Sequence, residues 1–255
     1  MLDSWALGEV TFGLWGTLDG AYVAEIAAAE GFAYHCVDRQ HGMIGEAAVA
    51  PMLTAIQGQG ASALVRVPAN EPWLIMQALD AGADGVVVPM VGDGAEAAAA
   101  VAACRYPPDG MRSYGPTRAT LAHRSADTAR LSEVACIAMI ETSRGLVNLE
   151  EIVATPGLDA IYIGPSDLAL ALGVAPDQGG SHPAHGEAIA RILATCLRRG
   201  VTPGIQCPDG VSARARAEQG FQMVSVGNDM ATLRRGLAAE LAIAREPLTP
   251  EDHHP

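Results

Sequence analysis

The sequence of 255 residues contains no lysine, and all sixteen of its basic residues are arginine. Enzymes that form a Schiff base join a carbonyl substrate to a lysine amine, so that route is closed to this chain. Any reaction here that generates a carbanion therefore needs electrostatic stabilisation, for which a bound divalent metal ion is the obvious device.

The sequence also lacks a basic net charge, long apolar runs and clustered cysteines. The net charge is −13 and the arginines are scattered, which argues against nucleic acid or an anionic membrane as a partner. No apolar run reaches the roughly 18 residues of a membrane span, and the N-terminus lacks the basic flank of a signal peptide. The five cysteines show no C-x-x-C spacing, so we expect reduced, mostly buried thiols in a cytoplasmic protein.

Short apolar runs alternate with alanine-rich helical patterns along the whole chain. Several runs are hydrophobic without interruption, as expected for parallel strands covered on both faces. The predicted strands are Val10–Trp15, Ala33–Asp38, Ala63–Val67, Gly85–Pro89, Cys136–Glu141, Ala160–Gly164, Thr202–Gln206 and Gln222–Val226. Helical patterns lie between them, at Ala21–Glu30, Ala47–Gln57, Pro72–Ala81, Ala95–Cys104 and Glu187–Arg198.

Eight such alternations without a linker predict a single-domain (β/α)8 barrel (a TIM barrel) over residues 1–245, with a disordered tail over residues 246–255. The structural alternative is an open, doubly wound sheet. Two connections, Arg105–Arg118 and Ala175–His185, are long and rich in proline and glycine, and each is either a lid or binding loop or a mere surface excursion. Arg112 in the first of them is a candidate to hold a substrate carboxylate.

Ionisable residues stand at the carboxyl ends of four predicted strands, which in a parallel barrel face the active site. They are Asp38 and His41, Arg66, Glu141 and Asp167. Each also has a structural interpretation. Glu141 and Arg66 can be partners in ion pairs, Asp167 or Ser166 can cap a helix, and Asp38 with His41 can form a local turn. Stability alone does not require all of them at one end, so together they indicate a functional site.

Their chemistry suits a 2-oxo acid. Two carboxylates together with water suit Mg²⁺ or Mn²⁺, and such a metal stabilises the enolate left when a carbon–carbon bond breaks beside the ketone. Arg66 can hydrogen-bond the ketone or enolate oxygen. His41, oriented by Asp38, can carry the proton of an aldol hydroxyl group. The turn formed by Gly164, Pro165 and Ser166 can offer backbone N–H groups to the substrate carboxylate.

The chain resembles the HpcH/HpaI family of class II, metal-dependent pyruvate aldolases over nearly its whole length. The resemblance rests on VDRQHG (37–42), VRVP (65–68), DAGADGVVVPMV (80–91), RYPPDGMRSYGP (105–116), IET (140–142) and IGPSDLALALG (163–173). It implies a (β/α)8 barrel that reversibly cleaves 4-hydroxy-2-oxo acids to pyruvate, or a related 2-oxo acid such as hydroxypyruvate, and an aldehyde.

By position, the resemblance makes Glu141 and Asp167 the ligands of Mg²⁺, Mn²⁺ or Co²⁺, and Arg66 the residue that stabilises the enolate. It makes His41 and Asp38 an acid–base pair acting through metal-bound water. It also implies dimers that exchange a C-terminal helix and assemble into hexamers, as trimers of dimers.

Two positions depart from the family pattern. Many relatives have glutamate where this chain has Gln40, and glutamine where it has Met139, and both changes affect hydrogen bonding around the proposed ligands. Two other functions remain open. One is a lyase for a citramalyl- or malyl-CoA thioester, for which the missing lysines are unfavourable. The other is a non-catalytic barrel that binds 2-oxo acids.

Overall fold

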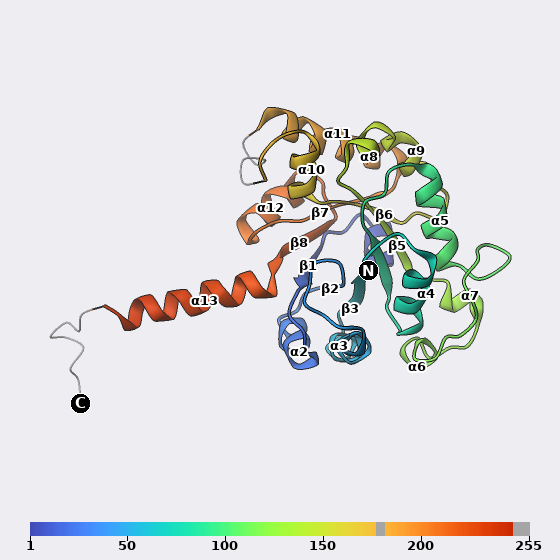
Figure 1. Ribbon diagram of the computed structural model, residues 1–255, viewed down its shortest axis with the longest axis horizontal. Coiled ribbons are helices and arrows are strands. Elements are labelled where there is room, and N and C mark those ends of the chain that lie inside the picture. The colour runs from blue at the N-terminus through green and yellow to red at the C-terminus, as the bar shows by residue number, and fades with distance from the viewer. Residues whose placement is uncertain (177–181, 247–255) are drawn as a thin grey trace.

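The eight predicted strands all form, and they close into one barrel in sequence order (Figure 1). The computed structural model describes residues 1–176 and 182–246. Every neighbouring pair of strands is parallel, so the open-sheet alternative is wrong and the fold is a single-domain (β/α)8 barrel. The strands are β1 (Thr11–Gly16), β2 (Tyr34–Asp38), β3 (Ser62–Arg66), β4 (Gly85–Val88), β5 (Ala135–Ile140), β6 (Ala160–Ile163), β7 (Thr202–Ile205) and β8 (Met223–Asn228).

Helices lie outside the strands of the barrel, and all of them except α1 and α13 connect consecutive strands (Figure 1). Those that lie before β5 are α1 (Leu2–Ala6), α2 (Ala21–Ala29), α3 (Glu46–Gly58), α4 (Pro72–Asp80), α5 (Gly94–Cys104), α6 (Ala119–Ala122) and α7 (Thr128–Leu131). Those that follow it are α8 (Ser143–Val147), α9 (Leu149–Val153), α10 (Pro165–Ala171), α11 (Pro183–Arg199), α12 (Gly210–Glu218) and α13 (Asp229–Ala244). Among the described residues, no helix has both the length and the apolar content needed to cross a bilayer.

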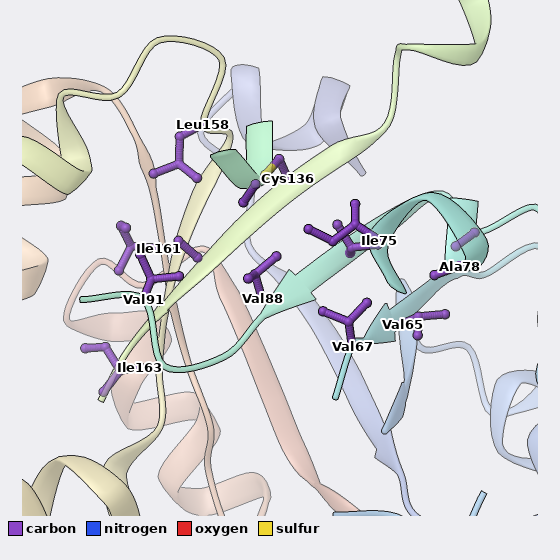
Figure 2. Packing of buried hydrophobic residues seen from close by; sticks show 14 of the residues in the cluster. Val65, Val67, Ile75, Ala78, Val88, Val91, Cys136, Leu158, Ile161 and Ile163 are labelled. Carbon is purple, nitrogen blue, oxygen red and sulfur yellow. The ribbon is translucent and has the colours of Figure 1, made fainter. Parts of the chain in front are cut away.

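The strands separate two apolar layers. Outward-facing side chains such as Val65, Val88 and Ile161 pack beneath the helices, as Figure 2 shows for β3 to β6 and α4. Inward-facing side chains fill the barrel itself, among them Tyr34, Leu64, Val87, Ile137 and Tyr162. The barrel is therefore a packed core, and the predicted buried, unpaired cysteines are confirmed at all five positions.

Five of the predicted strands extend one residue too far at their carboxyl end. The residues concerned are Val67, Pro89, Glu141, Gly164 and Gln206, each of which lies just beyond its strand. Each of these residues is the first after its strand, where the strand gives way to a loop, although Val67, Pro89 and Glu141 are still buried and the N–H groups of Val67 and Gln206 still donate to the neighbouring strand. Glu141, Gly164 and Gln206 therefore belong to the loops at the mouth of the barrel.

The long connection Arg105–Arg118 follows α5 and leads through α6 and α7 to the start of β5, so it lies at the amino-terminal end of the barrel. The prediction that it is a lid or substrate loop is wrong, because the carboxyl ends of the strands lie at the other end. Residues 177–181 of the second predicted loop, and residues 247–255 of the predicted tail, lie outside the described residues.

The last helix, α13, leaves the barrel and extends away from it (Figure 1). Its buried residue is Asp229, at the first position, whereas Leu233, Leu237 and Leu241 are each at least half exposed. These three leucines are spaced four residues apart and therefore lie on one face of the helix.

Candidate functional site

A cavity of about 240 Å³ opens at the mouth of the barrel, where the strands end. All eight residues predicted for the site line this cavity, namely Asp38, His41, Arg66, Glu141, Gly164, Pro165, Ser166 and Asp167. The structure thus brings together side chains that lie more than a hundred residues apart in the sequence. We treat this cavity as the candidate active site.

Asp38 and Arg66 form a buried ion pair at the cavity. They occupy matching positions at the ends of β2 and β3, so the parallel register places them side by side. Arg66 Nε donates to Asp38 Oδ1 at 2.9 Å, and Nη2 donates to Oδ2 at 2.6 Å. Burial alone raises the pKa of Asp38, but the hydrogen bonds and charge of Arg66 outweigh it and hold the pKa below its usual range. The structural interpretation of Arg66 as an ion-pair partner is therefore correct, and the same guanidinium also lines the cavity.

His41 lies in the loop between β2 and α3, and it is exposed at the edge of the cavity. Asp38 orients this loop through the backbone, because its Oδ1 accepts hydrogen bonds from the N–H groups of Gln40 and His41. The local turn considered for these residues is thus formed. Both carboxylate oxygens of Asp38 are held by Arg66, so the carboxylate positions the histidine loop and does not contact the imidazole ring directly.

Glu141 follows β5 and is 2% exposed. Its Oε1 accepts a hydrogen bond of 2.8 Å from the backbone N–H of Met90. Met90 has a φ of 59°, an uncommon conformation for a residue with a side chain, and this turn aims its N–H group at the carboxylate. Burial raises the pKa of Glu141, and the nearby charge of Asp167 raises it further.

The second oxygen of Glu141 is available to a ligand. Oε2 is buried without a hydrogen-bond partner, and it lies so close to Gly164 that a Cβ atom there would be 2.3 Å away.

Asp167 is the third residue of α10. The N-cap of this helix is Gly164, which has no side chain to cap it, so neither Asp167 nor Ser166 acts as the cap. In the described part of the chain no three His, Cys, Asp or Glu side chains form a metal-binding cluster. The candidate metal centre thus consists of two carboxylates.

Sequence reasoning did not place five further residues that line the cavity, namely Trp15, Thr17, Tyr162, Gln206 and Asn228; Met139, which departs from the family pattern, lines it as well. The rings of Trp15 and Tyr162 stack at 5.0 Å, and the Arg66 guanidinium lies 5.2 Å from the Trp15 ring. Met139 Sδ lies 4.0 Å from Arg66 Nη1. Their positions at or just beyond strand ends were visible in the sequence, but apolar and neutral side chains carry no signal of a binding role.

Arg112 does not reach the cavity. It is 2% exposed at the opposite end of the barrel, where Nη2 donates to Asp80 at 2.8 Å and Nη1 donates to the carbonyl of Leu131 at 3.0 Å. The guanidinium also lies 4.7 Å from the ring of Tyr106. The suggestion that Arg112 holds a substrate carboxylate is therefore wrong, since the side chain is buried away from the cavity and both Nη atoms donate within the fold.

Comparison with known proteins gives consistent results. The model of the family described as HpcH/HpaI aldolase/citrate lyase matches residues 11–236. A hydroxypyruvate/pyruvate aldolase from Rhizorhabdus wittichii is 39% identical, over 94% of this chain and 96% of the relative. A 5-keto-4-deoxy-D-glucarate aldolase from Klebsiella pneumoniae is 35% identical, with 90% of each chain covered. Among solved structures, an HpcH/HpaI aldolase/citrate lyase family protein from Burkholderia cenocepacia superimposes with a TM-score of 0.89, at 34% identity, over 96% of this chain and 98% of the other.

Proposed function

Because the chain belongs to the HpcH/HpaI aldolase/citrate lyase family, we propose that it is a carbon–carbon lyase that depends on a divalent metal ion. The reaction is the reversible aldol cleavage of a 4-hydroxy-2-oxo acid to pyruvate or hydroxypyruvate and an aldehyde. The observation that carries the proposal is the cavity at the strand ends, in which two carboxylates, a paired arginine and a histidine meet. The names of the relatives with 34–39% identity support the 2-oxo acid product.

Glu141 and Asp167 are the residues that would hold the metal ion. A buried carboxylate oxygen without a partner is costly unless a cation or donor satisfies it, and Glu141 Oε2 is such an atom. Carboxylates are the ligands preferred by Mg²⁺, Mn²⁺ and similar ions, so the donor set suits the metal. When bound, such a cation stabilises negative charge on the ketone oxygen of the substrate.

The other residues act through their own donors and charges. Nε and Nη2 of Arg66 are held by Asp38, so the guanidinium is fixed in place. Among the described residues, the hydrogen-bond partner of Nη1 is the distant sulfur of Met139, so Nη1 can donate to the substrate ketone oxygen. The His41 imidazole is exposed at the cavity and can exchange a proton with the 4-hydroxyl group. The first N–H groups of α10, beside Ser166, lack partners within the helix and can bind the substrate carboxylate.

Pyruvate release from a panel of 4-hydroxy-2-oxo acids tests the proposal. We expect no release in chelator and recovery when Mg²⁺, Mn²⁺ or Co²⁺ is restored. Glu141→Gln and Asp167→Asn should abolish the recovery, whereas Glu96→Gln should retain it, because Glu96 binds Arg144 and the Gly92 amide outside the cavity. Release without metal would contradict the proposal. Cleavage only of a CoA ester, either citramalyl-CoA to acetyl-CoA and pyruvate or malyl-CoA to acetyl-CoA and glyoxylate, would support the thioester alternative.

The exposed leucine face of α13 supports a homo-oligomer in which this helix packs on a second copy. The outer surface of β1 and β8 carries an apolar cavity of about 650 Å³, where a barrel of this type would have its last helix. It is lined by Leu14, Leu18, Val23, Ile26, Phe32, Val226 and Leu233. Since α13 extends away from this surface, we propose that the α13 helix of a partner copy covers it. A hexamer built from three such dimers remains a prediction.

Molecular mass in solution tests this assembly. Leu237→Asp places a charge on the leucine face of α13 and should shift the protein to monomers. Ala239→Asp introduces the same charge on the opposite side of the helix and should leave the mass unchanged. Equal masses for the two variants would contradict the packing of α13 on a partner.

A further inference from the structure

The two halves of the cavity differ in charge. Asp38 and Arg66 end β2 and β3, Glu141 follows β5, and Asp167 lies in the first turn of α10, after β6. The remaining arc of the barrel, formed by β7, β8 and β1, contributes Gln206, Asn228 and Thr17 to the cavity, and all three are neutral. We call Thr17, Gln206 and Asn228 the neutral wall. None of the catalytic or metal-binding roles proposed above involves it.

The amide groups of the neutral wall have fixed orientations. The Tyr162 hydroxyl donates to Gln206 Oε1 at 3.0 Å. Asn228 ends β8 and caps α13, since its Oδ1 accepts from the N–H of Ala231 at 2.7 Å. Because the oxygen of Asn228 is used by the cap, its NH₂ group is left as the donor that this residue can offer to a ligand.

Asp229 fixes the third member of the wall. This buried carboxylate accepts hydrogen bonds from Thr17 N at 2.8 Å, from Thr17 Oγ1 at 2.7 Å and from Leu18 N at 3.0 Å. The Thr17 hydroxyl gives its proton to Asp229 and therefore keeps only acceptor lone pairs. The Thr17 carbonyl in turn accepts from Met43 N at 3.0 Å, in the loop that carries His41.

A donor on Asn228 and an acceptor on Thr17 together match a hydroxyl group, which can accept from the first and donate to the second. An anionic group can accept from Asn228, but it has no proton to donate to Thr17 Oγ1. Within the described chain, Arg66 is the only arginine that lines the cavity, and two of its nitrogens are bound to Asp38. A carboxylate or phosphate on the neutral wall would also face Asp229 directly behind Thr17.

We propose that the neutral wall of Thr17, Gln206 and Asn228 is the subsite for the aldehyde, that it selects aldehydes carrying an uncharged hydroxyl group beside the carbonyl, and that Asp229 is its positioning residue. This inference rests on the proposed aldolase function. It adds the chemical class of the aldehyde, and it connects aldehyde selection to the first residue of the helix that extends toward a partner.

The experiment compares aldehydes in the addition direction, with pyruvate as the fixed nucleophile so that a hydroxyl on the 2-oxo acid cannot contribute. Glycolaldehyde and propanal have equal numbers of heavy atoms and differ by a hydroxyl against a methyl group, and glyoxylate supplies a carboxylate. We expect kcat/KM for glycolaldehyde to exceed that for propanal by about tenfold, the effect of two neutral hydrogen bonds. Glyoxylate should be the poorest acceptor.

Thr17→Val keeps the shape of the side chain and removes the acceptor, so the preference should fall to about threefold or less. Thr17→Ser keeps the hydroxyl and should retain the preference. A full preference in Thr17→Val, or glyoxylate as the best acceptor, would overturn the subsite.

Metal-dependent exchange of the pyruvate methyl protons in the unaltered protein separates the proposed aldolase function from the proposed aldehyde subsite. Its absence would contradict the proposed function, whereas exchange without any aldehyde preference would contradict only the subsite.

Asp229→Asn and Asp229→Ala test the positioning role. We expect KM for glycolaldehyde to rise severalfold in Asp229→Ala with a smaller change in kcat, and partial recovery in Asp229→Asn, which keeps one acceptor oxygen. Asp209→Ala is the control, because Asp209 also accepts a hydrogen bond from a backbone N–H group at the start of a helix, Ser212 N in α12, but within the described residues it has no hydrogen bond to the neutral wall. An equal KM change for glycolaldehyde and propanal in Asp229→Asn would show a general structural role and overturn the positioning claim.

Discussion

Arg66 and Arg112 are built into the protein in the same way but lie at opposite ends of the barrel. Each is buried, at 8% and 2% exposure, and each donates to an aspartate, Asp38 or Asp80. Each guanidinium also lies over an aromatic ring. Burial and pairing therefore do not distinguish a functional arginine from a structural one in this fold.

What distinguishes the two arginines is where each one lies relative to the strands. Arg66 ends a strand, so its side chain reaches the cavity where the other strands also end. Arg112 lies in a connection that returns from a helix to the next strand, and its two Nη atoms donate to the fold itself. In a (β/α)8 barrel, position relative to the strand ends separates catalysis from stability.

Arg66→Gln should produce the largest effect on activity. The substitution removes the charge and the donor nearest the ketone oxygen, so we expect kcat to fall by about 10²–10³-fold, or about 2.7–4 kcal/mol, as for a lost oxyanion donor. Steady-state cleavage of a 4-hydroxy-2-oxo acid measures it. A loss of tenfold or less would place Arg66 in the same structural class as Arg112.

Arg112→Gln should affect stability and leave catalysis unchanged. The ion pair with Asp80 is only partly buried, but the hydrogen bond to the Leu131 carbonyl is lost as well, so we expect the free energy of unfolding to fall by about 2 kcal/mol. Urea unfolding should show this decrease in the free energy of unfolding, while kcat per folded enzyme stays at the wild-type value. A large fall in kcat of the folded variant would mean that the two ends of the barrel are coupled.

The fold and the charged half of the site were predictable from the sequence for related reasons. Uninterrupted apolar runs reveal buried parallel strands, and a charge at the end of such a run, as at Glu141, is an exception that needs a cause. The pairing of Asp38 with Arg66 was not predictable, because it depends on the register between two strands.

The neutral half of the site could not be predicted in the same way. Thr17 and Asn228 are polar residues after strands, where turns and caps also favour them, so their sequence context fits both roles. The N–H group of Met90 acts on Glu141 through its backbone conformation, which its side chain does not encode. These features depend on how distant segments meet in the folded chain.

Asp38→Asn should show how charge contributes to the functional pair. The pKa of Asp38 is lowered in the folded protein, so its ionised form stabilises the fold above the unfolded pKa of about 4, and this contribution is lost as pH falls through the lower folded value. We expect the variant to be about 2 kcal/mol less stable at pH 7, with the difference from wild type shrinking in more acidic solution. Denaturant unfolding at several pH values measures it, and a difference that is constant with pH would contradict the role of the charge.

Met139→Gln should have the smallest effect, and it probes how freely Arg66 can reach the substrate. The thioether of Met139 is a weak acceptor 4.0 Å from Arg66 Nη1, so this nitrogen is available to the ketone oxygen. A glutamine amide oxygen at the same place would compete for the donor, and we expect KM for pyruvate in the addition direction to rise about threefold, the equivalent of one modest hydrogen bond. Met139→Leu is the control, because it keeps the apolar bulk without an acceptor and should leave KM near the wild-type value. A lower KM in Met139→Gln would mean that the amide orients the guanidinium toward the substrate and does not compete for it.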